Sequence, residues 1–125
     1  MSDLEAIRAA KRAALEAEMT RPGVVQAGDA DLEGLIADGT VFVDYWAPWC
    51  GPCRMFAPVF EAASRIHTGR ARFVKVNVDE AQMSAMQHQI QSIPTLMVFQ
   101  DGRPVARQAG AMPAPMFDAF VRRFL

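Results

Sequence analysis

Apolar and polar residues follow one another along this chain in blocks that predict alternating strands and helices. The run from Val41 to Trp46 is almost wholly apolar, which is typical of a strand buried on both faces. Apolar residues between positions 56 and 63 instead repeat at helical spacing, with Pro58 placed to kink that helix. Four more strands are predicted, at 24–27, 73–78, 95–99 and 105–109. This order indicates an α/β fold.

Two further helices and a hairpin are predicted from shorter sequence patterns. A helix around Leu32 to Ile36 is closed by Gly39, and an amphipathic helix ends the chain between 117 and 124. Asp101 and Gly102 separate the last two strands and predict an antiparallel hairpin, so the sheet should be mixed.

A short helix is also predicted after the strand at 73–78. Asp79 is placed to cap this helix, which carries Met83, Met86 and Ile90. We interpret the two methionines as core residues.

The first twenty residues differ from the rest of the chain because they are rich in alanine and charge. Ser2 and Glu5 have the spacing of a capping box, which predicts the start of a helix. The segment from Arg21 to Gly23 should end this helix. We therefore divide the chain into a helical extension, 1–22, and a globular domain, 23–125. The apolar stripe of the extension is interrupted by charges, which favours a loosely attached or fraying helix over a docking or dimerising one.

Composition narrows the class of protein. Half of the 125 residues are apolar, enough to bury one core without disulfides or a metal. The net charge of −1 gives no broad field for nucleic acid or an acidic membrane surface. No apolar run is long enough to span a membrane, and charged residues occupy the place of a signal core. We expect a monomer in the cytoplasm.

Cys50 and Cys53 are the only cysteines, and they lie where a buried strand gives way to a helix. Residues three apart on a helix are close enough to form a disulfide. So short a loop would stabilise the fold by only about 2 kcal/mol, which makes the pair a poor structural link. At the helix start, Cys50 should favour the thiolate and act as nucleophile. Cys53, one turn deeper, should act second and release the client thiol.

Zinc binding is the main competing use of such a pair, and it needs two further ligands. His67 and His88 are the candidates, but twenty residues separate them and the spacing is not that of a zinc site. We therefore favour redox chemistry, with no metal. Gly51 and Pro52 bring neither charge nor imidazole to the pair, which favours a reductant over an oxidant.

Several motifs in order resemble the thioredoxin family over roughly Val24 to Leu125. These are VDYWA, WCGPC at 49–53, Pro58, KVNVD at 75–79, SIPT at 92–95 and Gly110. The resemblance implies a three-layer fold with a central mixed five-stranded sheet, helices on both faces, and an extra N-terminal helix. It also implies a cis peptide bond between Ile93 and Pro94.

The resemblance assigns roles to further residues. Asp44 would be a buried carboxylate that carries a proton for Cys53, with a raised pKa. Lys75 resembles the lysine that neighbours this aspartate, although a lone strand lysine is more often simply solvated. Trp46 and Pro58 would be structural supports. The surface on which clients dock would comprise Trp49, Gly51, Pro52, Ile93, Pro94, Gly110 and Ala111.

The predicted function is a protein-disulfide reductase that needs no cofactor beyond its cysteine pair. Its partners would be disulfide-containing client proteins and a reductase that restores the dithiol, typically a flavin enzyme using NADPH in this family. The alternatives are an oxidase or isomerase on the same fold, and a docking module whose thiols are incidental. Tyr45, in a place more often phenylalanine, and the prolines between Met112 and Pro115 depart from the family pattern and leave client choice open.

Overall fold

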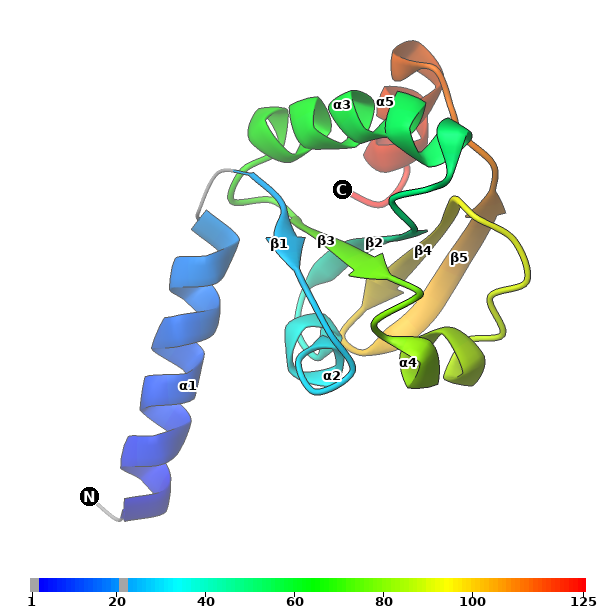
Figure 1. Ribbon diagram of the computed structural model, residues 1–125. Coiled ribbons are helices and arrows are strands. Elements are labelled where there is room, and N and C mark those ends of the chain that lie inside the picture. The colour runs from blue at the N-terminus through cyan, green and yellow to red at the C-terminus, as the bar shows by residue number, and fades with distance from the viewer. Residues whose placement is uncertain (1–2, 21–22) are drawn as a thin grey trace.

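The computed structural model describes residues 3–20 and 23–125, and side chains within 14–20 are not part of that description. The elements are α1 (Asp3–Thr20), β1 (Val25–Gln26), α2 (Leu32–Ile36), β2 (Thr40–Trp46), α3 (Gly51–Ile66), β3 (Arg72–Asn77), α4 (Gln82–Gln87), β4 (Thr95–Gln100), β5 (Arg103–Ala109) and α5 (Ala114–Arg122). Figure 1 shows their arrangement.

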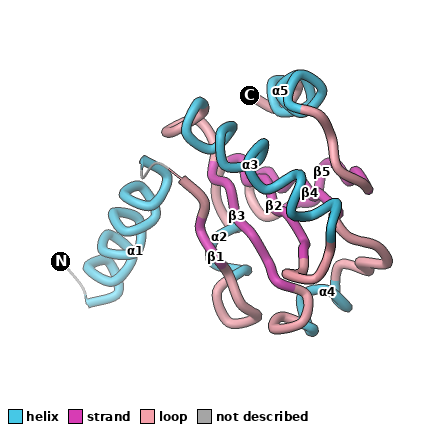
Figure 2. The backbone as a smooth tube through the Cα atoms, turned by 45° about the horizontal axis from the view of Figure 1, so that its top comes forward, coloured by secondary structure: helices cyan, strands magenta, loops and turns pink. Residues whose placement is uncertain are grey.

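The five strands form one mixed sheet in the order β1-β3-β2-β4-β5. β3 runs parallel to both β1 and β2, whereas β4 is antiparallel to β2 and to β5. The predicted hairpin at Asp101 and Gly102 is confirmed, with φ of 51° and 83° at these two residues. Helices α3 and α5 lie on one face of the sheet, and α2 and α4 on the other (Figure 2). The predicted three-layer α/β fold is confirmed.

Two hydrophobic clusters fill the space between the layers. Phenylalanines from β2, β3, α3 and α5 form the cluster on one face, and Phe42 stacks on Phe73 within it. The other cluster contains Val41, Val43 and Tyr45, together with residues of α2. Consecutive residues of β2 therefore enter opposite clusters. This two-sided burial explains why β2 is a continuous apolar run.

Helix α4 differs from the sequence-based expectation. Met83 and Met86 are 74% and 78% exposed, so the interpretation of them as core residues was wrong. This helix has only six residues and faces the fold through the small residues Ala81 and Ser84. Because small residues allow the backbone to approach closely, the methionines are left on the outer side.

The cap of α4 also comes from an unexpected place. Asp79 makes no capping hydrogen bond to this helix. Asp29 does, because its carboxylate accepts the backbone N–H of Ser84 at 2.7 Å and lies 3.4 Å from that of Met83. Hydrogen bonds to Ser84 hold the pKa of Asp29 below its ordinary value.

The predicted N-terminal helix is present as α1. Its described side chains, at residues 3–13, are all exposed, and Figures 1 and 2 show the helix extending away from the sheet. The predicted capping role of Ser2 and most of the joint before Gly23 lie outside the described residues. Among the helices that the structure describes, none is long and apolar enough to cross a membrane.

Strand β5 forms one edge of the sheet. Most of its side chains are exposed, and Pro104 interrupts its hydrogen-bonding capacity near the hairpin. The pairing of β5 with β4 shifts register between Val98 and Phe99, opposite this proline. The edge is therefore irregular.

Candidate active site

The cysteine pair lies where β2 leads into α3. Cys50 is the N-cap of α3, with φ −86° and ψ 113°, and its Sγ accepts a hydrogen bond from the backbone N–H of Cys53 at 3.2 Å. The two Cα atoms are 5.2 Å apart and the sulfurs are at disulfide distance. The N–H of Cys53 at this helix start therefore points at the Cys50 sulfur, where it would favour the thiolate form.

Both cysteines are largely covered, with exposed fractions of 5% for Cys50 and 2% for Cys53. The expected order of exposure holds, but Cys50 is less open than its position at a helix tip had indicated. Ala47, Ile93 and Trp46 pack around the pair. Any sulfur that reacts with Cys50 therefore has to approach along the surface around it.

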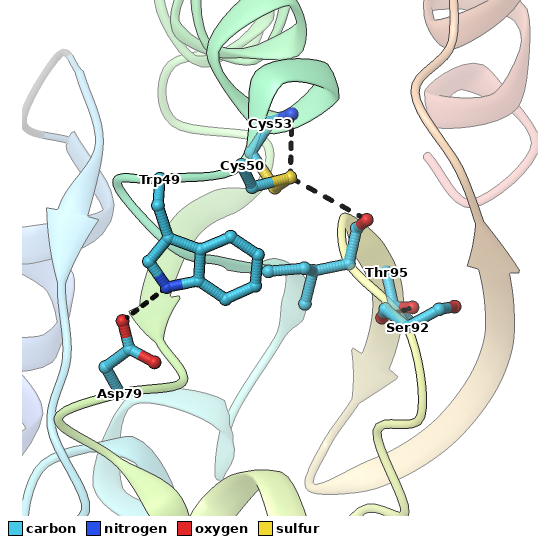
Figure 3. The surroundings of a disulfide bond; sticks show 7 residues. Trp49, Cys50, Cys53, Asp79, Ser92 and Thr95 are labelled. Atoms are coloured by element: carbon cyan, nitrogen blue, oxygen red, sulfur yellow. Dashed lines mark hydrogen bonds between the residues drawn. A yellow bond between two sulfur atoms is a disulfide. The ribbon is translucent and has the colours of Figure 1, made fainter.

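We call the residues on the two sides of Cys50 the frame: Ile93 and Pro94 on one side, and Trp49 on the other. The segment before β4 forms the first side. The carbonyl oxygen of Ile93 lies 3.8 Å from Cys50 Sγ (Figure 3), and the Ile93–Pro94 peptide bond is cis. Pro94 is buried, and its carbonyl oxygen accepts the N–H of Gly110 at 2.8 Å. Gly110 has φ 93°, and Ala111 beside it is exposed. The start of β4, the end of β5 and the start of α3 thus meet at the pair.

Trp49 forms the other side of the frame. Its side chain is 68% exposed, and its indole Nε1 donates a hydrogen bond to Asp79 Oδ2 at 2.8 Å (Figure 3). A depression of about 200 Å³ lies between Trp49, Ile93 and the residues that follow α4. The position of Asp79 in the sequence predicted a helix cap, whereas its carboxylate binds the Trp49 indole. The hydrogen bond joins residues thirty positions apart, which no local pattern reveals.

Asp44 is completely buried, and its two carboxylate oxygens have no hydrogen-bond partner among the described residues. Because alternate residues of a strand share a face, Asp44 points with Phe42 toward the face that α3 covers. Burial raises the pKa of Asp44 to about 7, and the positive charge of Lys75 opposes part of this rise. The group can therefore exist in both protonation states near neutral pH.

Lys75 is opposite Asp44 in the pairing of β2 with β3. It is buried and is therefore not a solvated strand lysine. Its ammonium lies 4.3 Å from the centre of the Trp46 ring, a cation–π distance. A lysine whose stem is covered by neighbouring strands cannot be told from a solvated one by sequence pattern.

The remaining predicted residues belong to α3. Gly51 begins this helix, and Pro52 is an exposed residue of its first turn. Pro58 lies within α3 and is exposed, and the kink expected there stays a prediction. His67 is the C-cap at the opposite end of α3 from the cysteines, and its Nε2 lies 3.3 Å from an Asp118 carboxylate oxygen. That placement argues against the competing zinc interpretation.

A cysteine pair closed across the first turn of a helix, at the end of a buried central strand, defines a thiol–disulfide oxidoreductase. Comparisons with known proteins agree with this class. The family model described as Thioredoxin matches residues 23–123. Curated proteins named Thioredoxin from Staphylococcus aureus strains Mu50 / ATCC 700699 and MW2 are each 43% identical to this chain over 90 residues, which cover 72% of the chain and 86% of each relative. The chain belongs to the thioredoxin family.

Proposed function

We propose that this chain reduces disulfides in other proteins, with Cys50 as the nucleophile and Cys53 as the resolving thiol. The observation that carries this proposal is the hydrogen bond from the Cys53 N–H to Cys50 Sγ at the start of α3. A group that donates to this sulfur stabilises negative charge on it and so favours the thiolate. The exchange needs no cofactor beyond the cysteine pair.

The reaction proceeds in two exchanges, each of which makes and breaks one S–S bond. The Cys50 thiolate attacks one sulfur of the client disulfide, forms a mixed disulfide and releases the other client sulfur as a thiolate. The Cys53 thiolate then attacks Cys50 Sγ, closes the Cys50–Cys53 disulfide and releases the second client sulfur. The client gains two electrons, and the cysteine pair loses two.

Asp44 accepts the proton that Cys53 must lose before it attacks. A carboxyl with a pKa of about 7 both accepts and returns a proton near neutral pH. Its position on the face that α3 covers supports this role, because Cys53 is buried on the inner side of that helix. Lys75, Trp46 and Pro58 support the site without taking part in the exchange.

Clients bind to the surface around Cys50. An exposed aromatic residue, Trp49, stands on one side, and the backbone near Ile93 and Pro94 offers an extended client segment a place to pair. Gly110 and Ala111 continue this surface on the β5 side, and Gly51 and Pro52 continue it on the helix side. Clients are thus held by their backbone and by apolar contacts.

The direction of electron flow is reductive, because Gly51 and Pro52 add no charge or imidazole that would stabilise the reduced pair further. A reductase-type donor restores the dithiol, and a reducing compartment such as the cytoplasm suits this cycle. Residues 23–125 form the catalytic domain, which acts as a monomer, and 1–22 are an extension of it. Neither nucleic acid nor a membrane takes part.

Reduction of a disulfide-bonded protein such as insulin tests the proposal. We expect Cys50→Ser to abolish catalysis. We expect Cys53→Ser to form a stable mixed disulfide with the client, and the attachment must be at Cys50 because the chain has only two cysteines. Cys50→Ser is the matched control, since its one thiol is the covered Cys53. Undiminished reduction by Cys50→Ser would refute the mechanism.

The same variants separate the alternatives. A docking module would trap no client in the Cys53→Ser form. An oxidase or isomerase would show a reduction potential well above that of the cellular dithiol reductants when equilibrated against glutathione.

A further inference from the structure

The segment between Asp79 and Ile93 places both sides of the frame around Cys50. Asp79 holds the Trp49 ring at one end of this segment, and Ile93 faces Cys50 Sγ at the other. Helix α4 lies between them and packs mainly through small side chains. Small side chains bury little apolar area. Ile90 and the His88 ring, 5.3 Å from that of Phe99, add core packing after α4, and polar contacts at the two ends of this helix supplement it.

Two charged side chains from distant parts of the chain bind the backbone at the two ends of α4. Asp29 accepts backbone N–H groups at the start of α4, as described above. Arg107, on the edge strand β5, donates from Nη1 to the carbonyl oxygen of Gln89 at 3.0 Å and from Nη2 to that of His88. These carbonyls belong to the turn that ends α4. An acidic group at the start of a helix and a basic group at its end both suit the helix dipole.

The turn that Arg107 binds has an unusual backbone. Gln89 has φ 54°, in the left-handed region that favours glycine. A non-glycine residue keeps this conformation only when its surroundings hold it there. Gln89 lies four residues before Ile93, so its conformation directs the chain toward the active site.

Arg107 makes these contacts across an open part of the surface. A groove of about 520 Å³ lies between the turn and β5, lined by residues 87–89, Met97 and residues 104–107. The Arg107 side chain crosses it from a position opposite Met97, with Nη2 3.8 Å from the Met97 sulfur. The guanidinium thus links the edge of the sheet to the turn where apolar packing is incomplete.

We propose that Arg107 is a positioning residue for client reduction: by binding the carbonyls of His88 and Gln89, it fixes the segment that places Ile93 opposite Cys50. This inference rests on the proposed function. Without Arg107 the turn is free to shift, and a client has to order the segment when it binds. Docking should then weaken while the sulfur chemistry at the start of α3 is unchanged.

Steady-state kinetics with two kinds of disulfide test this inference. For Arg107→Ala we expect the KM for a protein disulfide to rise roughly threefold to tenfold with kcat nearly unchanged. The rate with 2-hydroxyethyl disulfide, which is too small to span the frame, should stay within about twofold of wild type. Arg107→Lys, which keeps an ammonium donor, should recover part of the KM.

Arg103→Ala is the matched control, because it removes the same charge from the same strand. Amide hydrogen exchange adds a readout that does not depend on activity. Amide exchange at His88 and Ile90 should accelerate in Arg107→Ala. Exchange at Ala27, whose N–H donates to the carbonyl oxygen of Lys75 near the opposite edge of the sheet, should not change. If Arg107→Ala does not fold, Arg107→Gln replaces it in each assay.

The outcomes separate this inference from the proposed function. A wild type that reduces neither disulfide would refute the function itself. A wild type that reduces both, with Arg107→Ala indistinguishable from Arg103→Ala, would overturn only the role of Arg107. An equal loss on the protein and the small disulfide would also overturn it, because the sulfur site and not docking would then be impaired.

Discussion

Asp44 is a carboxyl group that folding removes completely from water without giving it a hydrogen-bond partner among the described residues. The unfolded group has an ordinary pKa of 3.8 and the folded group one of about 7. Between these values the folded protein binds more protons than the unfolded one, so stability falls as pH rises. At roughly 1.4 kcal/mol per pH unit, ionisation of Asp44 opposes folding by about 4 kcal/mol above pH 7.

Asp44→Asn should therefore stabilise the protein at pH 8, by about 1–3 kcal/mol, because the buried amide has a smaller desolvation cost than the carboxylate but still lacks a partner. Disulfide turnover should slow, since an amide cannot accept the Cys53 proton. Urea denaturation and insulin reduction at pH 8 measure the two effects.

The same pair of proteins at pH 4 is the control for this prediction. Asp44 is neutral there in the folded state and only about half ionised in the unfolded state, whose pKa is 3.8, so most of the stability gain should disappear. A lower denaturation midpoint at pH 8 with unchanged turnover would show that Asp44 is neither buried nor a proton carrier.

At the level of single residues, local motifs pointed to the central residues of the candidate site. Cys50, Cys53 and Asp44 stand out because two cysteines three apart and a carboxylate in an apolar run are visible within a few positions. The roles of Asp79, Arg107 and Asp29 could not be predicted, because each depends on a partner far along the chain. Such contacts arise only when the layers pack.

Two glycines that flank the site belong to different kinds of element, and their replacement should have opposite effects. Gly51 begins helix α3, whereas Gly110 follows strand β5 with φ 93°. Apart from the adjoining residues and, for Gly51, the nearby backbone of its own helix, no atom lies within 4 Å of a Cβ atom added at either position. Only the backbone preferences of glycine and alanine therefore distinguish the two substitutions.

Gly51→Ala should stabilise the protein by about 0.4–1 kcal/mol, because alanine restricts the unfolded chain and suits a helix. Gly110→Ala should destabilise it by about 1–2 kcal/mol, because a side chain disfavours positive φ. Urea denaturation of the oxidised proteins measures both. A stable Gly110→Ala variant would mean that the backbone at 110 is not held in the left-handed region.

At the level of elements, the pattern predicted strands and helices well wherever a large apolar residue marks the buried side. β2 and α3 are examples, because their buried positions carry valine and phenylalanine. Helix α4 is the counterexample: its buried side carries alanine and serine, so the exposed methionines produced the stronger signal. β1 has two residues instead of the four predicted at 24–27, although the N–H of Ala27 still donates to the carbonyl oxygen of Lys75.

The molecule as a whole does not depend on its disulfide for stability. The loop that Cys50 and Cys53 close is so short that the bond contributes only about 2 kcal/mol, and phenylalanine clusters hold the layers together instead. Reduction with excess phosphine should lower the free energy of unfolding by no more than about 2 kcal/mol and leave the fold intact. Circular dichroism with urea denaturation checks this, and unfolding on reduction would contradict it.

Removal of residues 1–22 should leave the stability of the domain and its insulin reduction within about twofold of the full chain, because the described side chains of α1 are exposed. A matched variant that replaces Leu4 and Ile7 by serine tests the helix surface alone. A large loss of activity in either form would assign the extension a part in client binding.

The irregular edge at β5 affects how readily this protein aggregates with other chains. Unpaired strands of other chains add readily to a regular, free sheet edge. Pro104 lacks the N–H that a growing ladder requires, and the register shift opposite it bends the template. A strand of another chain therefore finds a poor template along this edge, which should limit aggregation through β5.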